Sequence, residues 1–273
     1  MKFKGITYFV FILFLSTGFT KQNSVITWEK IDVGLYLGEY LSPVKSEFGD
    51  NKITILKIDP KHYAFEMVEA KQTGDQRKTA EDWCKEKKLL AAVNAGMYEP
   101  DGRNCGYMKN GKFMNNPVLN KKYNNILAFN PKDSTVPQMQ IIDLTCQNWE
   151  KLKTQYNNYS QNLRMMDCNG KNSWGKTARK WSVVVWGMDT AGNALWIFCR
   201  SPFTMPQFVD ILQKSPLGLK KLMYLEGGPE ATFYLNHKSF ERDLIGSYET
   251  GFRENDTNVG AWEIPNIIGI RKK

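Results

Sequence analysis

Two strand-like segments at residues 181–189 and 194–199 constrain the fold of this chain more than any other feature. Both are rich in β-branched and aromatic residues, and together they contain one charged side chain, Asp189. Unbroken apolar runs of this length are typical of strands that are covered on both faces. Because residues 190–193 between them suit a turn, the segments predict a hairpin in the centre of a sheet.

Further strands are predicted around this hairpin, and the predicted helices are few. The expected strands cover residues 24–40, 53–58, 63–68, 126–129, 138–144, 162–166, 219–225 and 262–271, with a second hairpin at residues 106–114. Helices are expected at residues 79–90, 147–156 and 205–215. Thr79 and Thr204 precede two of them as N-caps. Since strands and helices do not alternate regularly, we predict an α+β fold of mixed or largely antiparallel sheets with packed helices, in one domain.

The first 20 residues have the pattern of an export signal. Lys2 and Lys4 precede an apolar run at residues 8–15, and small residues follow at positions 16–18. This run is too short for a membrane span, and no later run approaches that length. We therefore predict a signal peptide over residues 1–20, a mature domain over residues 21–273 without a membrane span, and a periplasmic or extracellular location.

The chain is basic, with a formal net charge of +9. Its lysines and arginines are scattered and form no nucleic-acid-binding motif, so no nucleic-acid partner is expected. They make a solvated surface, or they attract anionic envelope material or a phosphate-bearing substrate.

Five cysteines and two histidines limit the chemistry available to the chain. The cysteines have neither CxxC nor Cys/His metal spacing, so we predict no metal site and no required cofactor. In an exported protein one or two disulfides are expected, and the odd number leaves at least one thiol unpaired. Cys146 and Cys199 are interpreted as small buried residues.

The stretch at residues 223–235 predicts a functional loop. An apolar strand ends at Glu226, Gly227 and Gly228 follow, and Glu230 precedes a second strand. Glycines allow a backbone to approach a ligand closely, so the two carboxylates would be held at a strand end. The alternative is a tight turn with both acids in solvent.

Two other segments carry polar groups among apolar neighbours. Asn94 and Gly96 end an apolar run at residues 90–98, and a buried Asn must find hydrogen-bond partners. Arg164 lies in the predicted strand at residues 162–166, where its charge requires an anionic partner or ligand unless its head reaches solvent. Aromatic residues make up 13% of the chain, which suits sugar stacking as well as a core.

The order of these motifs resembles the phosphodiester glycosidase family. The resemblance covers roughly residues 50–271 and rests on the segments at 94–98, 106–114, 161–166, 183–198 and 224–231. Many members have Asp-Gly-Gly-Gly-Ser where this chain has Glu-Gly-Gly-Pro-Glu at residues 226–230, which keeps the first carboxylate but lengthens its reach. The resemblance implies an exported hydrolase that releases a sugar from a sugar-1-phosphodiester or a phosphorylated glycan.

Roles for individual residues follow as hypotheses. Glu226 would be the principal catalytic carboxylate, and Glu230 a second one or an acceptor for a sugar hydroxyl. A divalent metal would be compatible with them although no ligand spacing requires one. Arg164 would bind phosphate, with Arg179 as a second candidate. The remaining substrate-binding candidates are Asn94, Gly96, Gly227 and Gly228. Two alternatives stay open: an envelope module that binds phosphorylated glycans without catalysis, and a structural domain in which Glu226 and Arg164 form a buried pair.

Overall fold

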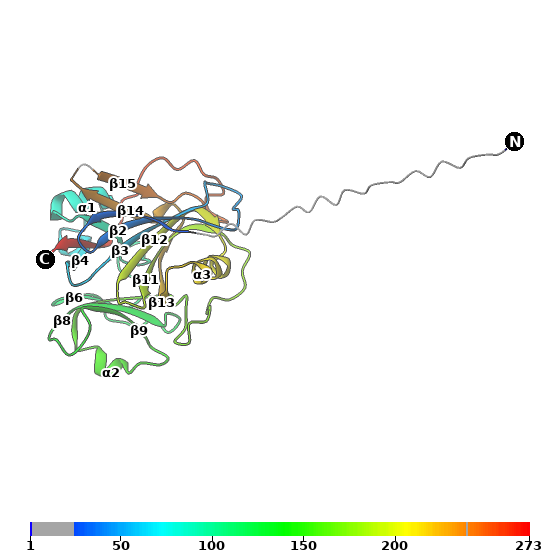
Figure 1. Ribbon diagram of the computed structural model, residues 1–273. Coiled ribbons are helices and arrows are strands. Elements are labelled where there is room, and N and C mark those ends of the chain that lie inside the picture. Colours follow the sequence, from blue (N-terminus) through cyan, green and yellow to red (C-terminus); the bar gives the residue numbers. More distant parts are fainter. Residues whose placement is uncertain (2–24, 239) are drawn as a thin grey trace.

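The computed structural model describes Met1, residues 25–238 and residues 240–273, and its sixteen named strands form three antiparallel sheets (Figure 1). The first sheet has the order β1-β2-β3-β12-β11-β13. Its strands are β1 (Thr27–Asp32), β2 (Leu35–Leu41), β3 (Lys52–Ile58), β12 (Ala194–Phe203), β11 (Trp181–Asp189) and β13 (Leu219–Gly227). The predicted central hairpin is confirmed, because β11 and β12 pair with each other and have β13 and β3 as outer neighbours.

The other two sheets have five strands each. The second sheet, ordered β15-β14-β5-β16-β4, contains β15 (Phe240–Ile245), β14 (Thr232–His237), β5 (Ala91–Asn94), β16 (Asn266–Lys272) and β4 (Tyr63–Glu69). The third sheet, ordered β7-β6-β10-β8-β9, contains β7 (Phe113–Asn116), β6 (Met108–Asn110), β10 (Tyr156–Asn162), β8 (Asn125–Pro131) and β9 (Met139–Asp143). The prediction of largely antiparallel sheets is confirmed.

Helices are short and few among the described residues. They are α1 (Ala80–Lys87), α2 (Trp149–Leu152) and α3 (Met205–Lys214), with 3-10 turns η1 (Ala70–Gln72) and η2 (Gly228–Glu230). Thr79 and Thr204 cap α1 and α3, since each hydroxyl accepts a hydrogen bond from a backbone N–H three residues later. Helix α1 contacts β5 and β14. The helix expected at residues 147–156 is only α2, because the chain enters β10 at Tyr156.

The main core lies where the three sheets meet. Trp186 of β11 and Trp196 of β12 have ring centroids 5.4 Å apart. Phe65 of β4 lies 5.3 Å from Trp186 and 6.0 Å from Phe129 of β8. One aromatic cluster therefore joins all three sheets, and burial of such rings is the main favourable contribution to folding.

Connections between sheets position the functional loop. Strand β13 ends in the first sheet at Gly227, and β14 begins in the second sheet at Thr232. The intervening η2 turn crosses from one sheet to the other, so both carboxylates of the loop lie at a sheet junction. Strands β3 and β4 likewise belong to different sheets although only a short turn joins them.

The predicted signal peptide, apart from Met1, lies outside the described residues. Within the residues that are described, no helix has the length and apolar character needed to cross a membrane.

Candidate functional site

The two glycines of the loop make room for the side chains around them. Gly228 has φ of +66°, a left-handed conformation that glycine adopts without strain. A Cβ at Gly228 would collide with the carboxylate of Glu249, and one at Gly227 would collide with the Tyr224 hydroxyl and the Trp181 ring. Both glycines therefore allow a close approach of acidic and aromatic groups to the backbone.

A cavity of about 260 Å³ opens beside this loop. Its walls carry three carboxylates, one guanidinium and three aromatic rings. The lining residues are Met97, Leu163, Trp174, Arg179, Trp181, Tyr224, Glu226, Gly227, Glu230 and Glu249. Glu226 and Glu230 therefore share one cavity, and the alternative of a loop with both acids in solvent is wrong for Glu226, which is 6% exposed.

The aromatic side of the cavity is a compact cluster. The ring of Trp174 lies 5.6 Å from Tyr224 and 6.3 Å from Trp181, and Trp181 lies 6.4 Å from Tyr224. Trp174 and Trp181 are only partly buried. Their rings provide the kind of apolar surface on which a sugar ring can stack.

The pKa of each carboxyl group in the cavity is raised above its ordinary value. Burial raises the pKa of Glu226 well above its ordinary value, and Glu230 and Glu249 raise it further. The Gly227 N–H opposes this rise in pKa by donating a hydrogen bond of 3.0 Å to Glu226 Oε1. Glu226 is thus the member of the cluster that burial most strongly favours as a neutral acid.

The other two carboxylates are better compensated. Burial raises the pKa of Glu230, but the Tyr98 hydroxyl, which donates a hydrogen bond of 3.2 Å to it, lowers that pKa. Burial also raises the pKa of Glu249, and Arg179 lowers it from a distance of 3.5 Å. One buried acid and two partly compensated acids therefore face the same space.

Asn94 and Gly96 lie behind the loop and do not line the cavity. The Asn94 amide donates to the Glu230 carbonyl at 2.9 Å, and its oxygen accepts from the Thr232 N–H at 2.8 Å. Gly96 packs against the side-chain amides of Asn104 and Asn162. In this arrangement Asn94 fixes the position of Glu230, while substrate binding by Asn94 and Gly96 stays a prediction.

Arg164 occupies a neighbouring pocket of about 200 Å³. Its guanidinium donates to both Asp143 oxygens at 3.2 Å and to the Thr145 hydroxyl at 2.7 Å. Asp143 is fully buried, so this ion pair neutralises its charge. The alternative of a structural domain with a buried Glu226–Arg164 pair is therefore wrong in its pairing, because Arg164 pairs with Asp143. Leu163 and Trp174 line both pockets and form the wall between them.

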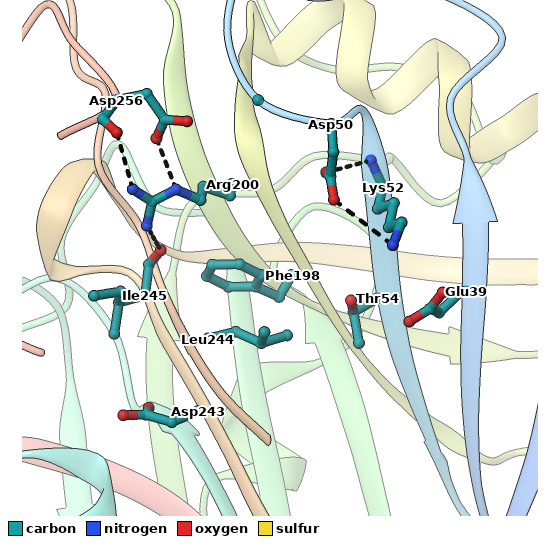
Figure 2. A pocket seen from close by; sticks show the side chains of 11 residues that line it. Glu39, Asp50, Lys52, Thr54, Phe198, Arg200, Asp243, Leu244, Ile245 and Asp256 are labelled. Carbon is teal, nitrogen blue, oxygen red and sulfur yellow. Dashed lines mark hydrogen bonds and ion pairs between the residues drawn. The ribbon is translucent and has the colours of Figure 1, made fainter. Parts of the chain in front are cut away.

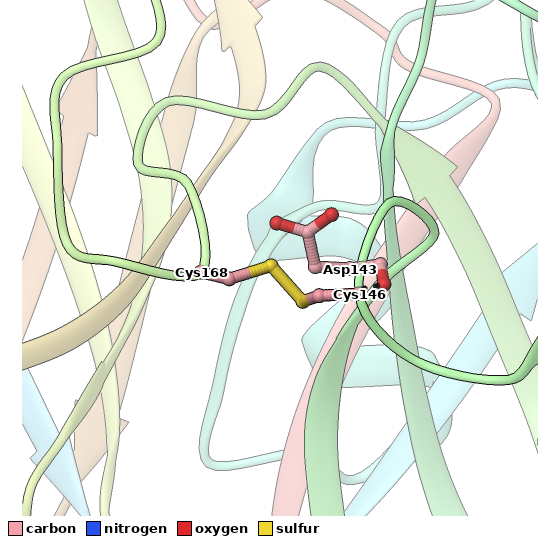
Figure 3. A group of neighbouring side chains, drawn as sticks. All are labelled: Asp143, Cys146 and Cys168. Atoms are coloured by element: carbon pink, nitrogen blue, oxygen red, sulfur yellow. Dashed lines mark hydrogen bonds between the residues drawn. A yellow bond between two sulfur atoms is a disulfide. The ribbon is translucent and has the colours of Figure 1, made fainter.

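A disulfide joins Cys146 to Cys168 beside Asp143 (Figure 3). It connects the turn after β9 to the segment that leads to Trp174. The interpretation of Cys146 as a buried residue is wrong, because it is exposed and bonded. Cys199 is buried as expected, and its thiol is free. Among the described residues this group alone brings three Cys, His or acidic side chains within metal-ligating distance, but its sulfurs are joined and its carboxylate is paired.

A larger pocket of about 440 Å³ lies between β2, β3, β12 and β15 (Figure 2). Its basic groups already have partners, because Arg200 lies 2.7 Å from Asp256 and Lys52 lies 3.9 Å from Asp50. None of the predicted site residues lines it. The Glu226 cavity is therefore the better candidate site.

Four acidic or aromatic residues of the cavity were missed as site candidates: Glu249, Trp174, Trp181 and Tyr224. Glu249 forms isolated bridges with Trp181 and Arg253 in a segment without regular periodicity. Trp174 comes from an irregular connection, and Trp181 and Tyr224 have the pattern of ordinary strand residues. The high tryptophan content was the one signal that pointed toward such an aromatic wall.

Most glycoside hydrolases use a pair of carboxyl groups that flank the scissile bond, and this cavity holds such a pair in Glu226 and Glu230. Comparison with known families agrees with this class. The chain belongs to the phosphodiester glycosidase family, whose model matches residues 87–271.

Two solved structures show the same fold. A hypothetical protein from Synechocystis has a TM-score of 0.62 and 12% identity, and the match covers 91% of this chain and 64% of that one. The zebrafish N-acetylglucosamine-1-phosphodiester alpha-N-acetylglucosaminidase catalytic domain, auto-inhibited by its pro-peptide, has a TM-score of 0.57 and 14% identity, with 92% and 83% covered. No curated protein sequence matches the chain.

Proposed function

We propose that this protein is an exported hydrolase that cleaves the bond between a sugar's anomeric carbon and the phosphate of a sugar-1-phosphodiester or phosphorylated glycan. The observation that carries the proposal is the cavity in which Glu226, Glu230 and Glu249 face three aromatic rings. It lies within the part of the chain that the family model matches. The zebrafish structure's name describes the same bond type, which supports this substrate class.

In the proposed reaction Glu226 is the general acid. Because burial favours its protonated form, it can donate a proton to the phosphate oxygen as the bond from C1 to that oxygen breaks. Glu230 accepts a proton from the water whose oxygen bonds to C1. The products are the free sugar and a phosphate monoester, and solvent exchange restores both carboxyl groups.

The phosphate is assigned first to Arg179. This residue lines the cavity, and its side chain is 62% exposed, so it can turn toward a ligand. Arg164 already neutralises Asp143 and is separated from Glu226 by the wall of Leu163 and Trp174. A phosphate that extends past this wall would instead meet Lys122 and Arg164.

Export is supported by the basic and apolar N-terminal sequence and by the Cys146–Cys168 disulfide. Disulfides persist in oxidising compartments and are rare in the cytosol.

The test is release of free sugar by the mature chain from a panel of sugar-1-phosphodiesters and matching aryl glycosides. Release from the phosphodiesters is the expected result, and release from the aryl glycosides alone would contradict the phosphate assignment. Saturable binding without product would instead identify a glycan-binding module.

A further inference from the structure

The core between the second and third sheets ends in polar side chains. Met67 and Ile268 pair across β4 and β16 and belong to the apolar core. Two residues further along the same face, Glu69 pairs with Asn266. From the third sheet, Met108 of this core pairs with Ser160, whose hydroxyl donates to the Ala95 carbonyl. The two sheets therefore enclose a polar region at this end of the core.

Oxygen atoms without partners collect in this region. The buried oxygen cluster consists of both carboxylate oxygens of Glu69 and the side-chain oxygens of Asn104, Asn162 and Asn266. These residues are at most 2% exposed. Among the described residues none of the five oxygens has a partner with good hydrogen-bond geometry. The side-chain amides of Asn115 and Asn110 approach Glu69 and lower its pKa, and the Asn115 amide nitrogen is likewise a buried group without a well-placed partner. Native proteins leave few buried polar groups unpaired, so the cluster requires an explanation.

The orientation of the amides is fixed by their nitrogen atoms. Asn104 donates to the Gly106 carbonyl at 3.0 Å, Asn162 to Ala95 at 3.2 Å, and Asn266 to Gly102 at 3.0 Å. Rotating any of these amides by 180° would place an oxygen against a carbonyl oxygen. Their own oxygens must therefore face the interior.

Cross-strand pairing places Asn266 beside Glu69, and further contacts link the other members of the cluster. A Cβ on Gly96 would touch the side-chain oxygens of both Asn104 and Asn162. The Asn115 side chain links Asn104 to Glu69, because its oxygen accepts from the Asn104 N–H at 2.8 Å and its amide lies beside the Glu69 carboxylate.

A proton cannot account for the whole cluster. Burial raises the pKa of Glu69 to about 7, opposed by the neighbouring amides of Asn115 and Asn110. Protonation would convert one oxygen to a donor and leave the amide oxygens without partners. No salt bridge to Glu69 is present within residues 25–238 and 240–273. A cation bound by several oxygens would satisfy the carboxylate and the amides together.

We propose that the buried oxygen cluster binds a hard cation, with Ca²⁺ as the best match. Ca²⁺ takes six to eight oxygen ligands from carboxylates, Asn side chains and backbone carbonyls in flexible geometry. The cation would lie behind residues 94–104, the segment that carries Tyr98 to Glu230. Its role is to hold this segment against the third sheet, so it stabilises the site without contacting substrate.

Metal content and thermal unfolding test this proposal independently of activity. The full mature chain is dialysed against metal-free buffer, analysed for bound metals, and melted with and without CaCl₂, MgCl₂, NaCl or KCl. With free Ca²⁺ at one hundred times its Kd, we expect Tm to rise by about 5–10 °C, and we expect a chelator to reverse the rise. No bound ion and no salt-specific shift in Tm would overturn the proposal in favour of buried water or a proton.

Two matched variants sharpen the result. Glu69→Gln keeps the side-chain shape but removes the charge. The free Ca²⁺ concentration needed for the same rise in Tm should therefore increase at least tenfold. Glu29→Gln changes an exposed residue of β1 and should behave like the wild type. An equal Ca²⁺ response in Glu69→Gln would place the ion elsewhere and overturn the assignment. Metal content of the wild type decides the question if Glu69→Gln fails to fold.

Discussion

Two adjoining pockets, one around Glu226 and one around Arg164, differ in how their charges are compensated. Around Glu226 three acids face one exposed guanidinium, and burial raises the pKa of each acid. Around Arg164 the single buried carboxylate of Asp143 has a guanidinium and a hydroxyl against it. Both pockets share the wall of Leu163 and Trp174. The uncompensated acids fit the catalytic role that we propose for the Glu226 cavity, and the compensated Arg164–Asp143 pair fits a stabilising role.

Replacing the buried acid should have the largest effect on activity. Glu226→Gln keeps the size of the side chain but cannot donate the proton, so kcat for phosphodiesters should fall by about 10²–10⁴-fold. The measurement is steady-state release of free sugar, with Glu29→Gln as the control at an exposed position. Turnover at the wild-type rate in Glu226→Gln would remove Glu226 from the mechanism and erase the contrast between the pockets.

Removing the guanidinium of the second pocket should act on stability. Arg164→Ala leaves the fully buried Asp143 without its ion-pair partner, which should cost about 3 kcal/mol in the free energy of unfolding. Denaturant unfolding measures this loss. The double variant Arg164→Ala with Asp143→Asn should recover part of it, because the unpaired charge is gone. A stable Arg164→Ala protein with weakened phosphodiester binding would restore Arg164 as the phosphate-binding residue.

Features of the two pockets that depend on local sequence patterns could be predicted, whereas the partners of their charged groups could not. The predicted central hairpin, the caps at Thr79 and Thr204, and the pair of carboxylates depend on local patterns, and the structure contains all of them. The partner of each charged side chain depends on how distant strands come together in the fold. Asp143 ends β9, and its approach to Arg164 follows from the way the third sheet packs against β13. Glu249 reaches the cavity through an irregular segment, where no periodicity indicates which way a side chain points.

The pH dependence of stability should reveal the raised pKa of Glu226. A carboxyl group with a raised pKa in the folded state binds its proton more tightly there than in the unfolded chain. Its stabilising contribution is complete below the unfolded value near 4.5 and is lost as pH rises toward the folded pKa. At pH values where Glu226 is protonated in the folded state but ionised in the unfolded chain, it lowers the free energy of unfolding by about 1.4 kcal/mol per pH unit.

Melting the wild type and Glu226→Gln across pH 4 to 8 measures this dependence. Gln does not titrate, so the variant should gain on the wild type as pH rises, and the two curves should converge near pH 4. Parallel curves would mean that Glu226 ionises as easily in the fold as in the unfolded chain. The acid role proposed for Glu226 would then fail, while its position in the cavity would stand.

The smallest expected effect tests whether the phosphate binds Arg179 or the neighbouring pocket that contains Lys122 and Arg164. Arg179 is largely exposed, so Arg179→Gln should leave Tm unchanged and raise KM for phosphodiesters by about 3–10-fold, with little change for aryl glycosides. Arg103→Gln removes a guanidinium outside the cavity and serves as the control. The parallel variant Lys122→Gln tests the neighbouring pocket without disturbing the Asp143 pair. If Lys122→Gln raises KM and Arg179→Gln does not, the phosphate lies beyond the wall of Leu163 and Trp174, and the two pockets form one extended substrate site.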